Sequence, residues 1–151
     1  MGASSMININ TEIIKKIETI KEYLSVVVQY TVLSKDELLK NIEKLSTMER
    51  HFQLMADQAF EINSVLAYQL GNKIPESNKS TFYELADLNI IDKHFAEKIA
   101  ESAKIRNSLI HSYEKVQKSV LIDEIKKFTE MYKEYISILI KKFMPVDNTN
   151  E

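Results

Sequence analysis

Apolar residues recur along most of this chain at intervals of three and four, the period of an α-helix with one buried face. Thr11 can cap the first helix, whose apolar positions are Ile13, Ile17, Ile20, Leu24, Val27 and Val28. Residues 34–37, Ser-Lys-Asp-Glu, match a capping box and predict the start of a second helix. Residues 46–49 repeat the pattern, so we expect a short helix and then a long one between residues 35 and 70.

The long helix has an apolar stripe and a clear end signal. The stripe consists of Phe52, Met55, Ala59, Ile62, Val65, Leu66 and Leu70. Gly71 then stands where a left-handed residue commonly ends a helix, and Pro75 follows shortly. Residues 77–80, Ser-Asn-Lys-Ser, predict a loop.

The second half of the chain predicts three further helical segments. A short helix is expected from Thr81 to Leu88, and another, capped by Asp92, continues through Ile105. The final helix begins near Ser119 or Asp123 and ends before Pro145. The whole pattern predicts an all-α fold, an antiparallel bundle of four long helices with one or two short ones.

Composition supports a single helical domain. The chain has 151 residues, with two Gly and two Pro, and these leave little turn material for a sheet. It has no cysteine, which excludes disulfides and thiolate chemistry and fits a cytoplasmic location. No apolar run is long enough to cross a membrane. We expect residues 1–5 to be a cloning remnant, residues 6–144 to form the domain, and residues 145–151 to be a flexible tail.

The net charge of −2 hides an uneven distribution. Residues 1–103 carry 11 basic and 15 acidic side chains, whereas residues 104–142 carry 9 basic and 5 acidic ones. Affinity for phosphate depends on local cations rather than on the overall sum. The basic segment therefore permits an RNA substrate without requiring one.

That basic segment contains the most informative residues of the chain, Arg106, His111 and Tyr113. A guanidinium can hold a phosphate through two parallel hydrogen bonds, and an imidazole can transfer a proton near neutral pH. RNA supplies its own nucleophile in the 2′-hydroxyl. These groups are sufficient to cleave a phosphodiester bond, and no cluster of metal ligands accompanies them.

Helix geometry separates the two candidate catalytic residues. Arg106 and His111 are five positions apart, which is roughly 140° of rotation on a straight helix. They can meet at one phosphate only if the helix ends or bends near residues 109–112, or if a second copy supplies the partner residue. The polar stretch after His111 favours a break there, and we prefer a helix-terminal site that faces a second copy of the chain, which predicts a dimer.

Arg106, four intervening residues, His111, one residue and Tyr113 resemble the motif of HepT-type toxins in the HEPN superfamily of all-helical ribonucleases. Upstream residues agree with this resemblance, which covers approximately residues 35–143; they include Glu49-Arg50, Gln53, Leu70-Gly71, Phe82-Tyr83-Glu84-Leu85-Ala86 and Asn89-Ile90-Ile91. The acidic positions of the long helix fall at Asp57 and Glu61, and no role is assigned to them.

The resemblance implies a homodimeric, metal-independent endoribonuclease toxin that needs no cofactor and cleaves tRNA or mRNA. Arg106 and His111 would be catalytic, and Asn107 would orient one of them. The resemblance further implies a partner, an MntA-type nucleotidyltransferase antitoxin, that transfers AMP to the tyrosine at position 113. An added AMP would place negative charge and bulk beside Arg106 and block an incoming RNA phosphate.

Two alternatives remain open at this point. The same bundle could be a non-catalytic dimeric partner and substrate of a minimal nucleotidyltransferase, or a helical scaffold in which the motif arises by chance. His51 and His94 have no motif around them and are interpreted as ordinary surface or half-buried residues. The aromatic residues of the last helix are interpreted as core or dimer interface rather than as platforms for RNA bases.

Overall fold

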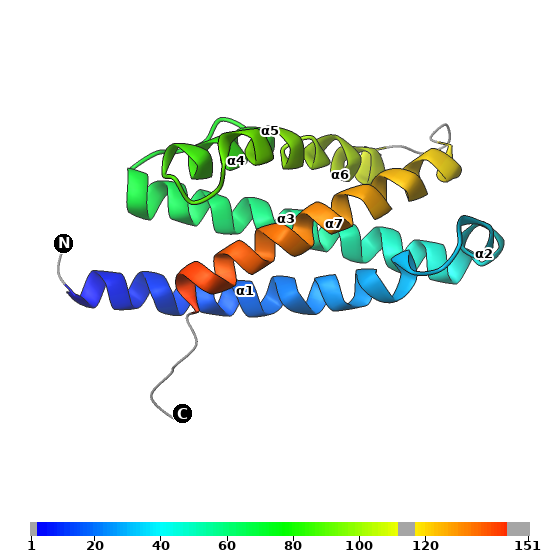
Figure 1. Ribbon diagram of the computed structural model, residues 1–151, viewed down its shortest axis with the longest axis horizontal. Coiled ribbons are helices and arrows are strands. Elements are labelled where there is room, and N and C mark those ends of the chain that lie inside the picture. The colour runs from blue at the N-terminus through cyan, green and yellow to red at the C-terminus, as the bar shows by residue number, and fades with distance from the viewer. Residues whose placement is uncertain (1–2, 112–116, 145–151) are drawn as a thin grey trace, which may run out of the picture.

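The computed structural model is an elongated bundle made entirely of helices in the part of the chain that it describes (Figure 1). It describes the backbone of residues 3–111 and 117–144, and the side chains from residue 11 onward within those ranges. The helices are α1 (Ala3–Thr31), α2 (Lys35–Lys40), α3 (Ile42–Gly71), α4 (Asn78–Asp87), α5 (Lys93–Ile99), α6 (Ser102–His111) and α7 (Lys118–Phe143). None of these helices is long and apolar enough to span a membrane.

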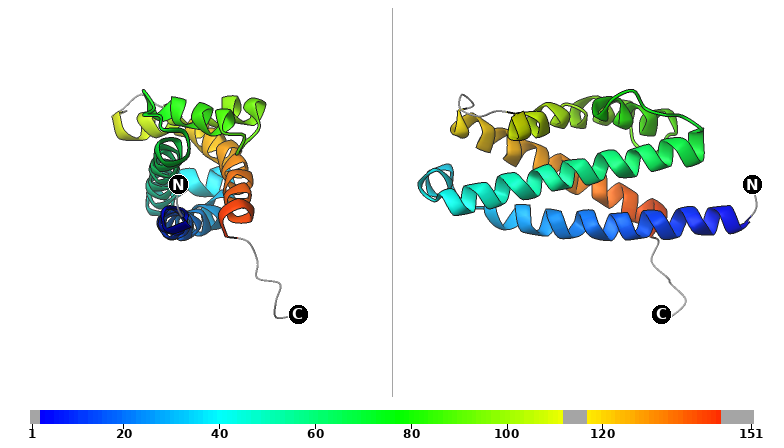
Figure 2. Two further views of the ribbon diagram at one scale, coloured as in Figure 1. Left: turned by 90° about the vertical axis from the view of Figure 1, so that its left-hand side faces the viewer. Right: turned by 180° about the vertical axis from the view of Figure 1, so that it is seen from behind.

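Three long helices and a row of short ones form the bundle. α1 packs against α3 and α7, and α4, α5 and α6 cover the side of the bundle that faces away from α1 (Figures 1 and 2). The prediction of an all-α bundle is confirmed. The place of a fourth long helix is taken by α4, α5 and α6 in succession, because turns at residues 88–92 and 100–101 interrupt it.

Several helix boundaries differ from the sequence prediction. α1 begins at Ala3 and not after Thr11, within the segment predicted to be a cloning remnant. α3 begins after Asn41, whose side-chain oxygen accepts a hydrogen bond from the Lys44 amide at 3.1 Å, so the pattern at residues 46–49 lies inside the helix. α7 begins at Lys118. The capping box at Ser34 and Glu37 and the cap at Asp92 are confirmed.

At the end of α3, Asn72 and not Gly71 takes the left-handed conformation. Asn72 has φ 53° and ψ 40°, and asparagine tolerates this region better than most residues. Gly71 is still helical, and a Cβ added there would lie 3.3 Å from Cδ2 of Leu88. The glycine therefore permits close packing against Leu88. The segment 77–80 is also not a loop, because Ser77 caps α4 and forms a capping box with Ser80.

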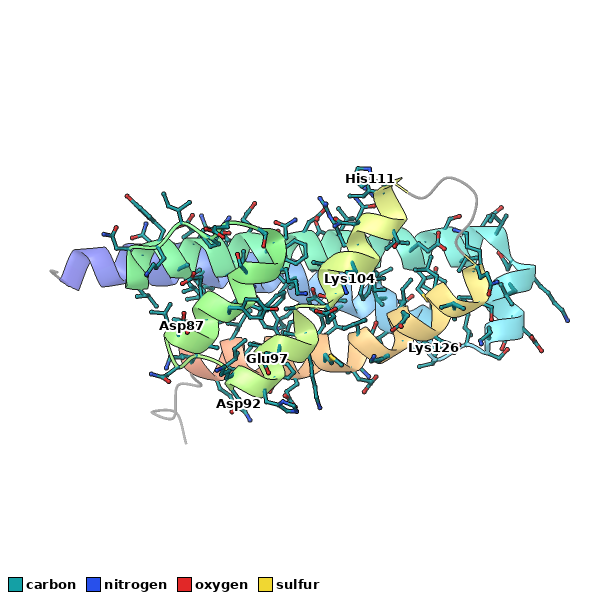
Figure 3. All side chains as sticks on the ribbon, turned by 90° about the horizontal axis from the view of Figure 1, so that it is seen from above. Asp87, Asp92, Glu97, Lys104, His111 and Lys126 are labelled. Carbon is teal, nitrogen blue, oxygen red and sulfur yellow. The ribbon has the colours of Figure 1, made fainter. Side chains whose placement is uncertain are left out.

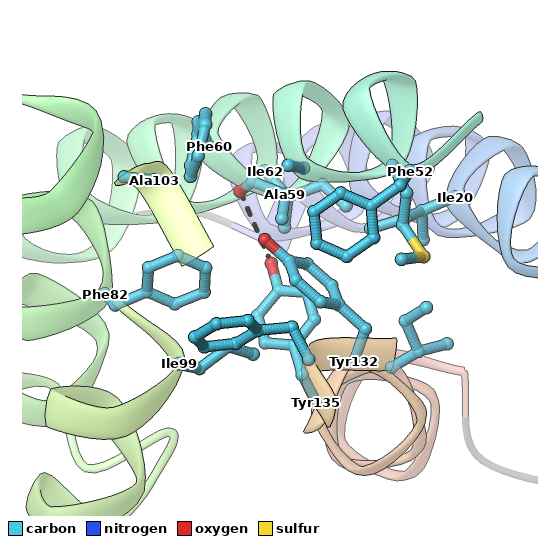
Figure 4. Close-up of a cluster of buried hydrophobic side chains, with 14 of the residues drawn as sticks. Ile20, Phe52, Ala59, Phe60, Ile62, Phe82, Ile99, Ala103, Tyr132 and Tyr135 are labelled. Atoms are coloured by element: carbon cyan, nitrogen blue, oxygen red, sulfur yellow. Dashed lines mark hydrogen bonds between the residues drawn. The ribbon is translucent and has the colours of Figure 1, made fainter. Parts of the chain in front are cut away.

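The core is centred on a cluster of aromatic side chains between α3, α4 and α7 (Figure 4). Phe82 makes edge-to-face contacts with Tyr132 and Tyr135, at centroid distances of 6.5 and 5.6 Å. Phe52 contacts Tyr132 at 5.9 Å, again edge to face. Such geometry is favourable beyond the burial of apolar area. The interpretation of the last helix's aromatic residues as core is thus confirmed for Phe128, Tyr132 and Tyr135.

Both buried tyrosines in this cluster have hydrogen-bond partners. The Tyr135 hydroxyl donates to Oδ1 of Asn63 at 2.6 Å, and the Asn63 amide donates to Oγ1 of Thr81 at 3.1 Å. This chain of bonds links α7, α3 and α4. Burial raises the pKa of the Tyr135 phenol well above its ordinary value, so the hydroxyl remains a donor.

We expect Tyr135→Phe to lower the free energy of unfolding by about 1–3 kcal/mol, because the buried Asn63 carbonyl oxygen loses its donor. Urea denaturation followed by circular dichroism measures this difference. Tyr83→Phe, at a side chain that is 37% exposed, is the matched control and should change stability little. Equal stability of the two variants would contradict the role given to the Tyr135–Asn63 bond.

Candidate active site

The first residue of α6 is held to α7 by a buried hydrogen bond. Oγ of Ser102 lies 2.9 Å from the hydroxyl oxygen of Tyr132 and donates to the Ile99 carbonyl at 2.6 Å. Both side chains are fully buried. Since the helix begins at Ser102, this contact fixes the start of α6 against α7.

A second contact holds the turn before α6 to α4. Lys79 of α4 lies 2.7 Å from the Glu101 carboxylate, and Lys104 of α6 lies 2.9 Å from its other oxygen. The hydrogen bond from Lys79, followed by that from Lys104, lowers the pKa of the Glu101 carboxyl to about 2. The segment that carries the candidate motif is therefore fixed from two sides.

α6 crosses the outer face of α3, as the positions of Lys104 and His111 show in Figure 3. At this crossing Nε of Arg106 donates to Oδ1 of Asp57 at 2.6 Å. Nη1 of Arg106 donates to Oδ1 of Asn107 at 3.2 Å. The Arg106 side chain is 23% exposed and that of Asp57 is 35% exposed. The guanidinium is thus partly desolvated and oriented, which strengthens its pairing.

Arg106 keeps hydrogen-bonding capacity for a ligand. A guanidinium has five N–H donors, and within the described residues Asp57 and Asn107 engage only two of them. Asp57 occupies the Nε edge, so the outer fork of Nη groups retains free donors. That fork is the part of arginine that binds a phosphate through parallel hydrogen bonds.

His111 is the last residue of α6 and is exposed. Figure 3 shows it at the outer end of the helix, pointing away from the bundle. No other described residue forms a hydrogen bond or ion pair with its ring. Tyr113, predicted as the AMPylation site, lies outside the described residues.

Arg106 and His111 do not converge within one chain by bending of the helix. α6 is continuous from Ser102 to His111, so the two residues remain roughly 140° apart around its axis and about 7.5 Å apart along it. α6 ends at His111, within the stretch where a helix end was expected, but it does not bend before that residue.

Sequence reasoning identified Asp57 only as an acidic position without a role. The structure pairs it with Arg106 across 49 positions of sequence. No local pattern signals such a contact, because it depends on how α6 crosses α3. Glu61, the other acidic position, instead pairs with Lys16 of α1.

The remaining histidines lie apart from this site. A ring nitrogen of His51 lies 2.9 Å from the Thr47 carbonyl oxygen, and the ring stands edge-on to Tyr23. His94 is exposed on α5, 4.0 Å from Glu97. Across the described ranges, no group of three or more His, Asp or Glu side chains could hold a metal ion.

The helices of the described residues define the class of protein, an all-α helical bundle. The family model described as Ribonuclease HepT-like matches residues 12–139, and the chain belongs to this family.

Two curated relatives span nearly the same length. The tRNA nuclease HepT of Aphanizomenon flos-aquae is 26% identical over 147 residues, which are 97% of this chain and 100% of that protein. The mRNA nuclease HepT of Shewanella oneidensis is 25% identical over 134 residues, or 86% of this chain and 97% of that protein.

Solved structures share the fold. The tri-AMPylated Shewanella oneidensis HEPN toxin in complex with its MNT antitoxin has a TM-score of 0.75 and 19% identity, covering 85% of this chain and 96% of that one. A toxin–antitoxin structure with AMP-PNP matches with the same score and identity, covering 85% of this chain and 97% of that one.

The ionic contact at Glu101 predicts a specific dependence of stability on pH. Because the pKa of the Glu101 carboxyl is lowered, its carboxylate stabilises the folded state at pH values above 4.5, the ordinary pKa of the group. This contribution is lost as the pH falls toward 2. We expect Glu101→Gln to be less stable than the parent at pH 7, and the difference to shrink between pH 4.5 and pH 2. Thermal melts across this range measure it. A difference that does not vary with pH would contradict the ionic role.

Proposed function

We propose that this chain is the toxin of a toxin–antitoxin pair and that its metal-independent endoribonuclease site contains Arg106 and His111 from two copies of the chain. Asn107 and Asp57 orient Arg106. The RNA is a tRNA or an mRNA, the substrates named for its relatives. Since RNA and ATP are both cytoplasmic, the proposal places the protein in the cytoplasm.

The observation that carries this proposal is the Arg106–Asp57 ion pair beside an exposed His111. Asp57 fixes the guanidinium by its Nε edge at 2.6 Å and leaves Nη donors available. The arrangement therefore favours binding of an external oxyanion, and a phosphodiester is such a ligand.

The straight α6 helix supports a composite site. About 140° separates Arg106 from His111 on one helix, so the two side chains of one chain do not face the same phosphate. Across an interface between two chains, they can. A two-fold axis beside α6 places Arg106 of each copy opposite His111 of the other. The dimer thus contributes residues to each site and is required for its completion.

The chemistry follows from these groups. His111 removes the proton of a ribose 2′-hydroxyl, and the 2′-oxygen forms a bond to phosphorus while the bond from phosphorus to the 5′-oxygen breaks. Arg106 stabilises the additional negative charge on the phosphoryl oxygens in the transition state. A proton returned from imidazolium or water neutralises the leaving 5′-oxygen. The products are a 2′,3′-cyclic phosphate and a 5′-hydroxyl.

We expect the nuclease activity to be regulated by covalent modification. A nucleotidyltransferase antitoxin transfers AMP from ATP to the hydroxyl of Tyr113 and releases pyrophosphate. The solved relative whose toxin is AMPylated and bound to an MNT antitoxin supports this part of the proposal. The AMP phosphate repels an RNA phosphate and competes for the same guanidinium.

His111→Ala should reduce RNA cleavage by about 10²–10⁴-fold, the usual contribution of a positioned acid or base, and leave the helical content unchanged because the side chain is exposed. Cleavage of a labelled tRNA, with analysis of the 3′ ends for cyclic phosphate, measures this. His94→Ala, at another exposed histidine, is the matched control. If the parent protein cleaves no RNA, the nuclease proposal is wrong and the two non-catalytic alternatives are left.

Mixing two inactive variants tests the composite site. In a heterodimer of Arg106→Ala and His111→Ala, one site lacks both residues and the other retains both. Random reassociation should therefore restore about a quarter of the parental cleavage rate. No recovery in demonstrated heterodimers would place Arg106 and His111 of the same chain at each site.

Co-expression with a nucleotidyltransferase antitoxin should increase the mass of the chain by whole AMP units, and Tyr113→Phe should abolish this increase because the accepting hydroxyl is absent. Intact-mass spectrometry with peptide mapping measures it. Tyr83→Phe, a tyrosine on α4 remote in sequence from the motif, should be modified like the parent. An undiminished mass increase in Tyr113→Phe would assign the modification to another residue.

A further inference from the structure

The 20 basic residues of this chain include only two arginines, Arg50 and Arg106. Arg106 belongs to the site already described. Arg50 is an exposed residue of α3, the same helix that supplies Asp57. Arginine is the side chain best suited to planar, two-point binding of phosphate, so the position of the second one requires an explanation.

Arg50 has no hydrogen-bond or ion-pair partner among the described residues. Helical neighbours three and four positions away normally provide such a partner. Around Arg50 these positions hold no carboxylate; they are occupied by Ser46, Thr47, Gln53 and Leu54. In contrast, Lys104, Lys127 and Lys133 each have a glutamate three positions earlier and pair with it.

The acidic residue next to Arg50 is engaged elsewhere. Glu49 accepts a hydrogen bond from Nζ of Lys118 at 2.9 Å, and its side chain is only 16% exposed. This pair joins α3 to the first turn of α7. The guanidinium of Arg50 therefore stands as an uncompensated cation with all its donors available to a ligand.

Arg50 also lies on the same face of α3 as Asp57. Seven positions on a helix correspond to a rotation of roughly 20° and a rise of about 10.5 Å, and α3 is continuous from Ile42 to Gly71. Since Arg106 docks on Asp57, the two guanidiniums belong to one surface stripe along α3. The stripe is parallel to the axis of the longest described helix and can follow an extended ligand.

We propose that Arg50 binds a phosphate of the RNA strand outside the scissile linkage, an inference that rests on the proposed nuclease function. A stacked strand carries one phosphate per about 3.4 Å of its axis. The rise of about 10.5 Å from Arg50 to Asp57, the residue on which Arg106 docks, therefore corresponds to about three nucleotides. Arg106 acts at the reacting phosphate, and Arg50 holds the strand in register some three nucleotides away. Arg50 contributes to binding and not to the chemical step.

RNA binding tests this assignment directly. In the His111→Ala background, which prevents cleavage, Arg50→Gln should raise the Kd for a single-stranded oligoribonucleotide of ten nucleotides about three- to tenfold. The slope of log affinity against log salt should decrease in magnitude by about 0.7, the value for one lost phosphate contact with a single strand. Arg50→Lys should recover part of the affinity, because charge remains but the fork is lost.

A matched control is available on α1. Lys15 is exposed and its side chain has no ion pair within the described ranges, and α1 lies on the opposite side of the bundle from α6 (Figure 1). Lys15→Gln removes the same charge and should alter neither the Kd nor the salt slope. An equal loss in Lys15→Gln would show that overall charge, and not a contact at Arg50, governs binding.

Substrate length separates a strand contact from a structural effect. With an otherwise active protein, Arg50→Gln should raise KM on the ten-nucleotide substrate and leave kcat within about twofold. On a dinucleotide, which cannot reach Arg50, the variant and parent should have the same kcat/KM. A loss on the dinucleotide as large as on the longer RNA would overturn the inference.

Failure of this inference is distinguishable from failure of the proposed function. If the parent cleaves RNA and Arg50→Gln keeps the parental Kd, KM and salt slope, the assignment of Arg50 is wrong and the nuclease is unaffected. If the parent binds RNA through Arg50 but cleaves none, Arg50 retains its role and the catalytic proposal is wrong.

Discussion

The hydrogen bond between Tyr132 and Ser102 is the contact on which the position of the motif depends. Burying a tyrosine hydroxyl without a partner costs several kcal/mol by order of magnitude, and Ser102 supplies that partner at 2.9 Å. Because Ser102 is the first residue of α6, satisfying the buried phenol also determines where α6 begins. The edge-to-face packing of Phe52 and Phe82 holds the Tyr132 ring in place (Figure 4). The need to pair a buried hydroxyl in the core thereby helps to position α6, which carries Arg106 and His111 at the surface.

From that origin, α6 crosses α3, and the crossing brings Arg106 to Asp57. The core is complete in one chain, since the aromatic cluster and its polar partners are all internal. The proposed site is different, because a rigid helix holds its arginine and its histidine on different sides. The core is complete in one chain but the proposed site is not, and this difference gives a physical reason for dimerisation.

Ion pairs also surround α6. Within the described residues, several lysines near α6 pair with carboxylates: Lys79 and Lys104 share Glu101, and Lys118 binds Glu49. These pairs lie at the surface and contribute little stability individually. Their effect is to leave the unpaired guanidinium of Arg50 and the free Nη donors of Arg106 as the positions where an anion gains most. Local positive potential therefore coexists with a net charge of −2.

Local signals in the sequence determined the helical class, most of the core stripes of the long helices, the caps at Ser34 and Asp92, and the spacing of Arg106 and His111. These features depend on spacing within a few residues, which periodicity and capping rules can detect. Leu70, predicted in the stripe of α3, is instead 44% exposed. Only the tertiary structure decided that Asp57 holds Arg106, that Tyr132 holds Ser102, and that three short helices replace a fourth long one. The caps predicted at Thr11 and at residues 46–49 were wrong because the helices continue through both positions, and Asn72 rather than Gly71 takes the left-handed conformation at the end of α3. Contacts between residues 30 or 49 positions apart arise from the way that helices pack, and no local pattern encodes them.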